Sequence, residues 1–163
     1  MTKLGQGRWP KEHLNCLITG PAGVGKSFLA CALAHQACRE GLSVRYLRLP
    51  RLLNELAVAR GDGRYRKLLV QLARTDLIVL DDFGLAALAE DSRRDLLEIL
   101  EDRYQCRSTI VTSQYPVESW HELINDPTLA DAILDRLVHQ SYRLALKGES
   151  MRKHQQPLET ENT

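Results

Sequence analysis

Residues 20–27 read Gly20-Pro21-Ala22-Gly23-Val24-Gly25-Lys26-Ser27, a match to the phosphate-binding pattern G-x-x-x-x-G-K-[ST]. The glycines allow the backbone to form a concave nest whose N–H groups point at phosphate oxygens. Lys26 would place a positive charge at the β- and γ-phosphates, and the Ser27 hydroxyl would bind Mg²⁺. A flexible glycine-rich turn is the alternative interpretation of this stretch taken alone.

The sequence on either side of the loop favours nucleotide binding over a flexible turn. Leu14–Thr19 is an apolar run of strand length, and apolar residues at helical spacing follow from Phe28 onward. A helix that begins here would point the positive end of its dipole at the phosphates. We therefore expect residues 20–28 to bind a nucleotide.

The composition is that of a single globular domain. The chain has 163 residues, of which 44% are hydrophobic and 26% charged, with a net charge of +1 at pH 7. This charge argues against a strongly basic nucleic-acid module but leaves local basic patches open. The longest apolar runs are of strand length and Met1–Trp9 has no signal-peptide core, so we expect a cytoplasmic protein with no membrane contact.

The four cysteines indicate a reducing compartment. They show neither C-x-x-C nor paired metal-ligand spacing: Cys16, Cys31, Cys38 and Cys106. Cys31 and Cys38 share helical spacing with Ala34, so we place them on the apolar face of the first helix. We expect reduced cysteines packed in the core of a cytosolic protein.

The rest of the pattern alternates strands with helices. The strands expected after the first cover residues 42–49, 76–82, 108–114 and 141–146. The expected helices cover residues 51–60, 64–74, 91–106, 116–124 and 128–138, with Gly61-Asp62-Gly63 as a turn and Asp91 or Ser92 as a helix cap. This alternation predicts one compact α/β domain with a parallel sheet and right-handed crossovers.

Asp81 and Asp82 end a strand that is apolar over its whole length. Because the carboxyl ends of parallel strands share the edge that holds the phosphate loop, both carboxylates are expected to face the nucleotide. Asp81 would hold Mg²⁺ directly or through water, and Asp82 would orient or deprotonate the attacking water. Capping of the turn at Phe83-Gly84 is the structural alternative. Glu is the commoner residue at the second position, and the shorter Asp predicts slow hydrolysis or a different water position.

Gln114 and Arg136 are the other candidate catalytic residues. Gln114 ends a strand, where it would reach the γ-phosphate or its water; a turn residue ahead of Pro116 is the alternative. Arg136 lies in the last expected helix, where it would stabilise transition-state charge in a neighbouring subunit's site. A surface ion pair with Asp131 or its neighbours is the alternative, and spacing alone does not choose between them.

Together these motifs resemble the AAA+ ATPases of the initiator and helicase-loader clade, most closely the IstB-like transposition helper ATPases, which are relatives of the helicase loader DnaC. The stretches that carry the resemblance are residues 20–30, 80–85, 112–117, 129–137 and 146–152. Many NTPases share the first two stretches, whereas the last three in this order are much more specific. The match covers residues 14–153, and we expect residues 1–13 to be an N-terminal remnant and residues 154–163 a polar, disordered tail.

The resemblance implies a P-loop AAA+ fold of three layers around a five-stranded parallel sheet, with ATP and Mg²⁺ as cofactors. It makes residues 20–27 the Walker A motif and Asp81-Asp82 the Walker B motif. Gln114 matches the sensor-1 position and Arg136 the arginine finger. Arg152 matches a sensor-2-like residue that contacts the nucleotide within the same subunit, for which a solvated C-terminal charge is the alternative.

The resemblance also implies partners. Such ATPases assemble head to tail, so that Arg136 would complete a neighbour's site. They bind duplex DNA without sequence preference when ATP is bound, and they assist a transposase. Family members carry several tens of helical residues before the core, where this sequence has only residues 1–13. We expect a shortened form or a fragment, and assign to it no contacts made through that region.

A basic cluster at the Gly61-Asp62-Gly63 turn is the candidate DNA contact. It consists of Arg60, Arg64, Arg66 and Lys67. In initiator-clade relatives a helical insertion at this place faces a DNA channel, so these charges are expected to touch phosphates. A solvated turn is the alternative.

Three other functions stay open on the sequence alone. A DnaC-like helicase loader would share the ATPase core and differ in its partner. A small-molecule kinase would share the phosphate loop but would need an arginine-rich lid and an acceptor pocket. A nucleotide-dependent scaffold would scarcely hydrolyse ATP, which Asp at position 82 allows.

Overall fold

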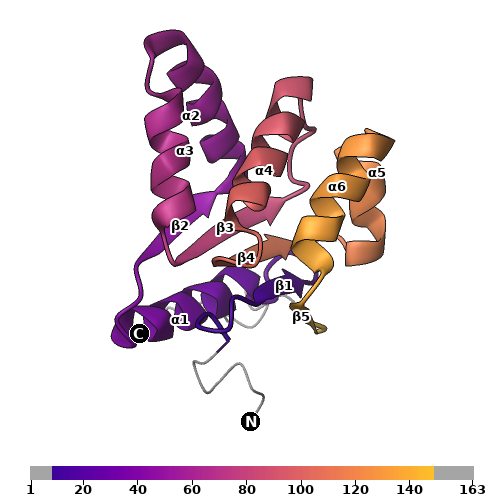
Figure 1. The fold of residues 1–163 in the computed structure, drawn as a ribbon. Helices are drawn as coiled ribbons and strands as arrows, with labels where there is room; N and C mark the ends of the chain where they lie inside the picture. The colour runs from indigo at the N-terminus through magenta and orange to yellow at the C-terminus, as the bar shows by residue number, and fades with distance from the viewer. Residues whose placement is uncertain (1–8, 149–163) are drawn as a thin grey trace, which may run out of the picture.

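A computed structural model describes residues 9–148, in which a five-stranded sheet lies between two layers of helices (Figure 1). The strands are β1 (Asn15–Thr19), β2 (Val44–Arg48), β3 (Leu77–Phe83), β4 (Ser108–Ser113) and β5 (Ser141–Ala145). They are all parallel and lie in the order β2-β3-β4-β1-β5. The α/β fold and the parallel sheet predicted from the alternation of strands and helices are therefore confirmed.

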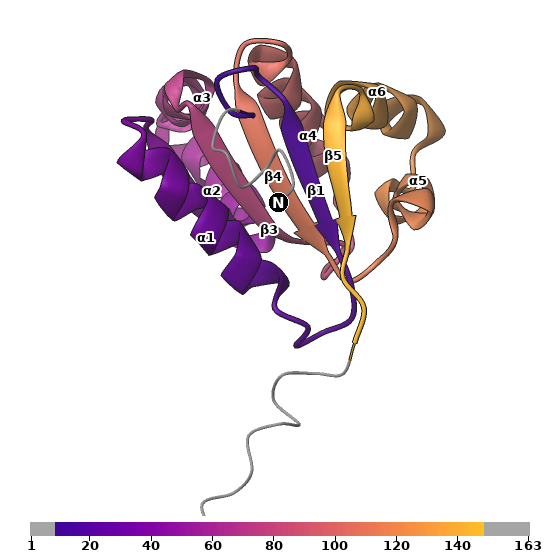
Figure 2. The same cartoon turned by 90° about the horizontal axis from the view of Figure 1, so that it is seen from below.

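One helix covers one face of the sheet, and the remaining helices cover the other (Figures 1 and 2). The single helix is α1 (Lys26–Arg39). The opposite layer contains α2 (Leu49–Asp62), α3 (Tyr65–Arg74), α4 (Glu90–Arg103), α5 (Trp120–Ile124) and α6 (Pro127–Val138), with the short 3-10 helix η2 (Val117–Ser119) before α5. Within residues 9–148, no helix has both the length and the apolar character needed to cross a bilayer.

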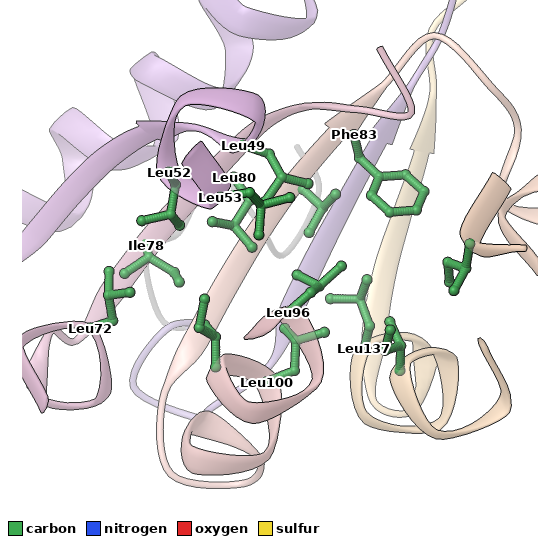
Figure 3. Packing of buried hydrophobic residues seen from close by; sticks show 14 of the residues in the cluster. Leu49, Leu52, Leu53, Leu72, Ile78, Leu80, Phe83, Leu96, Leu100 and Leu137 are labelled. Carbon is green, nitrogen blue, oxygen red and sulfur yellow. The ribbon is translucent and has the colours of Figure 1, made fainter. Parts of the chain in front are cut away.

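The larger hydrophobic core lies between the sheet and the layer of α2 to α6 (Figure 3). Leucines from α2 and α4 meet apolar side chains of β3 there, and the residues labelled in the figure are Leu49, Leu52, Leu53, Leu72, Ile78, Leu80, Phe83, Leu96, Leu100 and Leu137. Each fully buried leucine contributes about 1.5–3 kcal/mol relative to an exposed one. This core fixes β3, and with it the carboxylates at the end of β3.

The second core lies between the sheet and α1. Alanines and two leucines of α1 pack on Cys16, Ile18, Val79 and Ile110 of the sheet, together with Trp9, which is only 2% exposed. The Ser108 hydroxyl donates a 3.1 Å hydrogen bond to the carbonyl of Pro10. The packed structure therefore includes residues before Leu14, where the domain was expected to begin.

Two local predictions about helix ends are wrong. The expected turn at residues 61–63 is the last turn of α2, which continues through Gly61 and Asp62 and ends at Gly63 with φ 84°. The helix α4 starts at Glu90, so Asp91 and Ser92 lie inside its first turn and neither caps it. The negative charges of Glu90 and Asp91 stabilise this helix start through the helix dipole, which replaces a side-chain cap.

The prediction of core cysteines holds for one residue of four. Cys16 is buried in β1, whereas Cys31, Cys38 and Cys106 are exposed. For Cys31 and Cys38 the reason is the orientation of α1, whose sheet-facing side consists of Ala30, Leu33, Ala34 and Ala37. Because most residues of this helix are small or apolar, periodicity alone did not identify the side that the sheet would cover.

A buried arginine joins the amino-terminal ends of β3 and β4. Arg103, the last residue of α4, is 2% exposed and donates hydrogen bonds from all three guanidinium nitrogens. The acceptors are the carbonyls of Leu72 and Thr75 at 2.6 Å, of Asp76 at 3.2 Å and of Ser108, and the Thr109 hydroxyl at 3.1 Å. Burial lowers the pKa of Arg103 to about 9.

We predict that Arg103→Met lowers the free energy of unfolding by about 3–5 kcal/mol, because it leaves several buried carbonyls without a donor. Urea denaturation followed by circular dichroism measures this loss. Arg94→Met is the matched control, since Arg94 lies on the same helix in an exposed ion pair with Glu90. The control should change the stability by less than about 1 kcal/mol. Equal losses in the two variants would contradict a structural role for Arg103.

Candidate nucleotide-binding site

The loop between β1 and α1 has the backbone conformation of an anion-binding nest. Gly23 and Gly25 have φ values of 78° and 99°, a region that glycine enters without steric cost. Gly20 has φ 154°, and a Cβ added there would lie 2.6 Å from the carbonyl oxygen of Leu146. The loop therefore passes directly against the chain after β5, which only glycine permits. Figure 2 shows this loop at the edge to which the strand arrowheads point.

A cleft of about 630 Å³ opens beside this loop, within the size range of small-molecule sites. Its lining comes from the loop, from β2 and from the ends of β3 and β4: Ala22, Gly23, Gly25, Lys26, Ser27, Phe28, Tyr46, Arg48, Asp81, Asp82, Leu85 and Gln114. The structure thus brings together around one cleft the lysine, serine, aspartates and glutamine that the sequence singled out. Gly20, Pro21 and Val24 shape the loop without lining the cleft.

Asp81 is buried and is held by hydroxyl groups from three elements. It is 3% exposed, and it accepts hydrogen bonds from Ser27 at 3.0 and 3.1 Å, from Tyr46 and from Thr112. Burial and the bond to Asp81 raise the pKa of Tyr46. The Ser27 hydroxyl and the Asp81 carboxylate are hard oxygen ligands, already adjacent at the mouth of the phosphate loop. They fit the donor set that Mg²⁺ prefers.

Asp82 has a left-handed backbone conformation near the end of β3. Its φ is 69°, and the pairing of β3 with β4 shifts register between Leu80 and Phe83. Aspartate is among the few residue types that enter the left-handed region readily, which gives a physical reason for Asp at this position rather than the longer Glu. Its carboxylate accepts hydrogen bonds from Arg48 Nη2 at 2.8 Å and Nε at 3.3 Å.

Lys26 is folded back onto its own loop. Its Nζ donates a 2.8 Å hydrogen bond to the carbonyl of Pro21, and the residue is 8% exposed. Burial lowers the pKa of Lys26, while the charges of Asp82 and Asp81 act in the opposite direction. A phosphate in the nest would provide the ammonium group with an anionic partner.

Gln114 follows β4 and lines the cleft beside Asp82 and Leu85. The residue is exposed, and in the described part of the chain no hydrogen bond engages its side chain. Its amide group is therefore free to contact a bound nucleotide.

Arg136 lies outside the cleft, at the opposite edge of the sheet. Its carbonyl accepts a 3.4 Å hydrogen bond from Asn15, the first residue of β1, whereas the phosphate loop follows the last residue. A five-residue strand separates these two edges by about 17 Å. The guanidinium pairs with Asp135 at 2.7 Å and not with Asp131, which contacts His121 instead. Arg152 lies outside the described residues.

The four basic residues near the α2–α3 connection differ in their partners. Arg60 pairs with the buried Asp95 and lies over the ring of Tyr65 at 4.7 Å. Arg64 pairs with Asp62 at 2.8 Å. The other two, Arg66 and Lys67, are exposed on α3 and form no ion pair with any residue between 9 and 148.

Tyr46, Arg48 and Thr112 are site residues that the sequence analysis did not select. The period-two pattern of residues 42–49 does place Tyr46 and Arg48 on one face of a strand. However, only the pairing of β2 with β3, in which Arg48 lies opposite Asp81, brings them to the carboxylates. Thr112 bridges the two aspartates, donating to Asp81 and accepting from the Asp82 N–H at 3.0 Å.

We predict that Gly20→Ala weakens nucleotide binding at least about tenfold and destabilises the fold by about 1–3 kcal/mol, because the added Cβ would overlap the Leu146 carbonyl. Titration with a fluorescent nucleotide and urea denaturation measure the two effects. Gly61→Ala is the control: it lies inside α2 with nothing within 4 Å, and should stabilise the protein by about 0.5–1 kcal/mol. Unchanged nucleotide affinity in Gly20→Ala would show that this close approach does not shape the site.

The fold matches solved structures of a helicase loader, of DnaI and of a replication initiator. The DnaC helicase loader superposes with a TM-score of 0.70 at 23% identity, covering 85% of this chain and 81% of that one. DnaI superposes with a TM-score of 0.77 at 21% identity, covering 88% of this chain and 79% of DnaI. The initiator DnaA, bound to AMPPCP and single-stranded DNA, gives 0.75 at 15% identity and covers 90% of this chain but 44% of DnaA. The expected fold, a five-stranded parallel sheet flanked by helices, is therefore one that these proteins share.

Sequence comparison identifies the family. The family model described as IstB-like ATP binding protein matches residues 1–159. A protein of Sinorhizobium fredii assigned as an insertion sequence ATP-binding protein is 60% identical over 153 residues, which is 94% of this chain and 62% of that protein. A protein assigned to the insertion sequence IS21 of Pseudomonas aeruginosa is 38% identical over 138 residues, 85% of this chain and 52% of the relative. The chain thus spans less than two thirds of the length of these relatives, and it belongs to the IstB-like family of ATP-binding proteins.

Proposed function

We propose that this chain binds ATP with Mg²⁺ and hydrolyses it as the ATPase of an insertion sequence, in an oligomer that binds DNA and assists a transposase. One observation carries the proposal: a lysine, a serine and two aspartates converge on one cleft, while the candidate arginine finger lies at the other edge of the sheet. The names of the relatives, which place them in insertion sequences, favour a transposase over a replicative helicase as the partner.

The phosphate loop would bind the β- and γ-phosphates. Its backbone N–H groups and the start of α1 supply positive potential, and Lys26 exchanges the Pro21 carbonyl for phosphate oxygens. When bound, Mg²⁺ neutralises charge on the phosphates. Ser27 and Asp81 would hold it, because Thr112 and Tyr46 keep the Asp81 carboxylate directed toward the loop.

Asp82 would orient the attacking water and accept its proton. In the structure Arg48 donates both of its hydrogen bonds to Oδ2 of Asp82, at 2.8 and 3.3 Å, so Oδ1 is the oxygen left to contact a water. Gln114 lines the same cleft and would hold the water or the γ-phosphate from the side of β4.

Arg136 would act in a second copy of the chain. Because the length of β1 separates Arg136 from its own cleft, it would stabilise transition-state charge in a head-to-tail neighbour. DNA would contact the exposed cations of α3, Arg66 and Lys67, which have no ion pair within residues 9–148. Two solved structures with a similar fold contain DNA. DnaA is bound to single-stranded DNA, and the Orc1 protein of Aeropyrum pernix is in complex with DNA.

We predict that Lys26→Ala and Arg136→Ala chains are each inactive alone but regain ATP turnover when mixed. In the mixture, one chain supplies a complete cleft and the other supplies the finger. An arginine finger contributes about 10³–10⁵-fold to turnover, so the recovered rate should be well above either variant alone. Arg94→Ala, an exposed arginine of α4, serves as the control and should remain active by itself. A mixture that stays inactive, although Arg136→Ala still binds nucleotide, would favour a self-contained, kinase-like site.

We predict that Arg66→Ala with Lys67→Ala reduces the salt dependence of DNA binding. Each phosphate contact contributes about 0.9 to the slope of log K against log salt, so the double variant should lower the slope by about 1.8. Fluorescence anisotropy of labelled duplex DNA at several salt concentrations, with ATP present, measures this slope. Arg94→Ala should leave it unchanged. An unchanged slope in the double variant would remove both residues from the DNA interface.

A further inference from the structure

The guanidinium of Arg136 contacts two neighbouring side chains: Asp135 at an N–H group and Tyr104 at its flat face. Nη1 of Arg136 donates a 2.7 Å hydrogen bond to the Asp135 carboxylate. The Tyr104 ring lies against the face of the guanidinium, with 4.8 Å between Cζ of Arg136 and the ring centroid. The side chain is 34% exposed, so the remaining N–H groups face solvent. An anion approaching Arg136 would compete with Asp135 for N–H donors but not with the ring of Tyr104.

The position of Tyr104 is fixed by the buried arginine beside it. Tyr104 caps the end of α4, directly after Arg103, and its N–H donates to the Glu101 carbonyl at 3.2 Å. Arg103 is anchored to the ends of α3, β3 and β4 by its hydrogen bonds. The residue that carries the ring therefore directly follows one that hydrogen bonds fix to α3, β3 and β4.

The backbone of Arg136 is fixed to the same edge of the sheet. Asn15 donates to the carbonyls of Arg136 and Leu137, at 3.4 and 3.1 Å, and accepts from the Thr109 N–H at 3.0 Å. Hydrogen bonds thus fix the backbone of Arg136, and the side chain of the residue before Tyr104, to the starts of β1 and β4. The flexible part that remains is the arginine side chain itself, whose immobilisation costs rotamer entropy.

We propose that Tyr104 is a positioning residue that presets Arg136 for contact with the phosphates bound by a neighbouring copy of this chain. The inference rests on the proposed function, in which Arg136 acts in trans. The ring keeps the guanidinium in place during this contact, because a cation–π contact uses the guanidinium face and leaves its N–H edges to the phosphate oxygens. Asp135 holds the same group only until the phosphate displaces it.

The mixture of Lys26→Ala and Arg136→Ala chains tests the proposal, because each chain then has one role. Tyr104→Leu in the Lys26→Ala chain, which donates the finger, should lower the recovered ATP turnover at least about threefold. The same substitution in the Arg136→Ala chain, which donates only the cleft, should leave the turnover unchanged. Tyr104→Phe in the finger donor should also retain the turnover, since the aromatic face is preserved.

The outcomes that overturn the proposal differ from those that overturn the proposed function. Equal losses from Tyr104→Leu in either chain would show a general structural role, and so would a loss of ATP-dependent association measured by light scattering. A loss with Tyr104→Phe would show that the hydroxyl matters and not the ring. Full turnover with Tyr104→Leu in the finger donor overturns the inference alone. Absence of turnover in the parent mixture overturns the action of Arg136 in trans, and the inference with it.

Discussion

The arrangement of the candidate site depends on the buried carboxylate of Asp81. A carboxylate that is 3% exposed is costly unless its oxygens are hydrogen-bonded, and here three hydroxyl groups supply the bonds. Ser27 comes from the start of α1, Tyr46 from β2 and Thr112 from β4. Because each bond requires its own element to be in register with β3, the charge of one residue couples the phosphate loop to three strands.

A second buried charge stabilises the opposite edge of the sheet. It is a cation that donates hydrogen bonds, whereas Asp81 is an anion that accepts them. Arg103 is a buried cation that satisfies the carbonyls where α3 ends and where β3 and β4 begin. One edge is thus organised by an anion that receives hydroxyl donors, and the other by a cation that donates to backbone oxygens. The cleft for the nucleotide lies at the first edge and Arg136 at the second, so two copies in the same orientation would bring the two edges together.

Several features were predictable because they depend on residues close in sequence. The five strands were found from short apolar or alternating runs, and the ends of Ser108–Ser113 agree within one residue with the expected strand. Predictions failed where a neighbouring layer decides the outcome. The orientation of α1 exposes Cys31 and Cys38, and α2, which is buried at Leu56 and Ala59, continues through Gly61, where a turn was expected. Tertiary contacts override such weak local preferences.

The phosphate loop, the paired carboxylates and the family of this protein follow from the linear sequence, because a nest of glycines and a charge at a strand end need only local backbone conformation. The tertiary structure decided which other side chains join them. Tyr46 and Arg48 reach the carboxylates because β2 pairs with β3, and Arg136 lies away from its own cleft because α6 ends beside the start of β1. Strand order and helix packing arise from contacts between distant residues, and a single sequence does not carry those contacts in any local pattern.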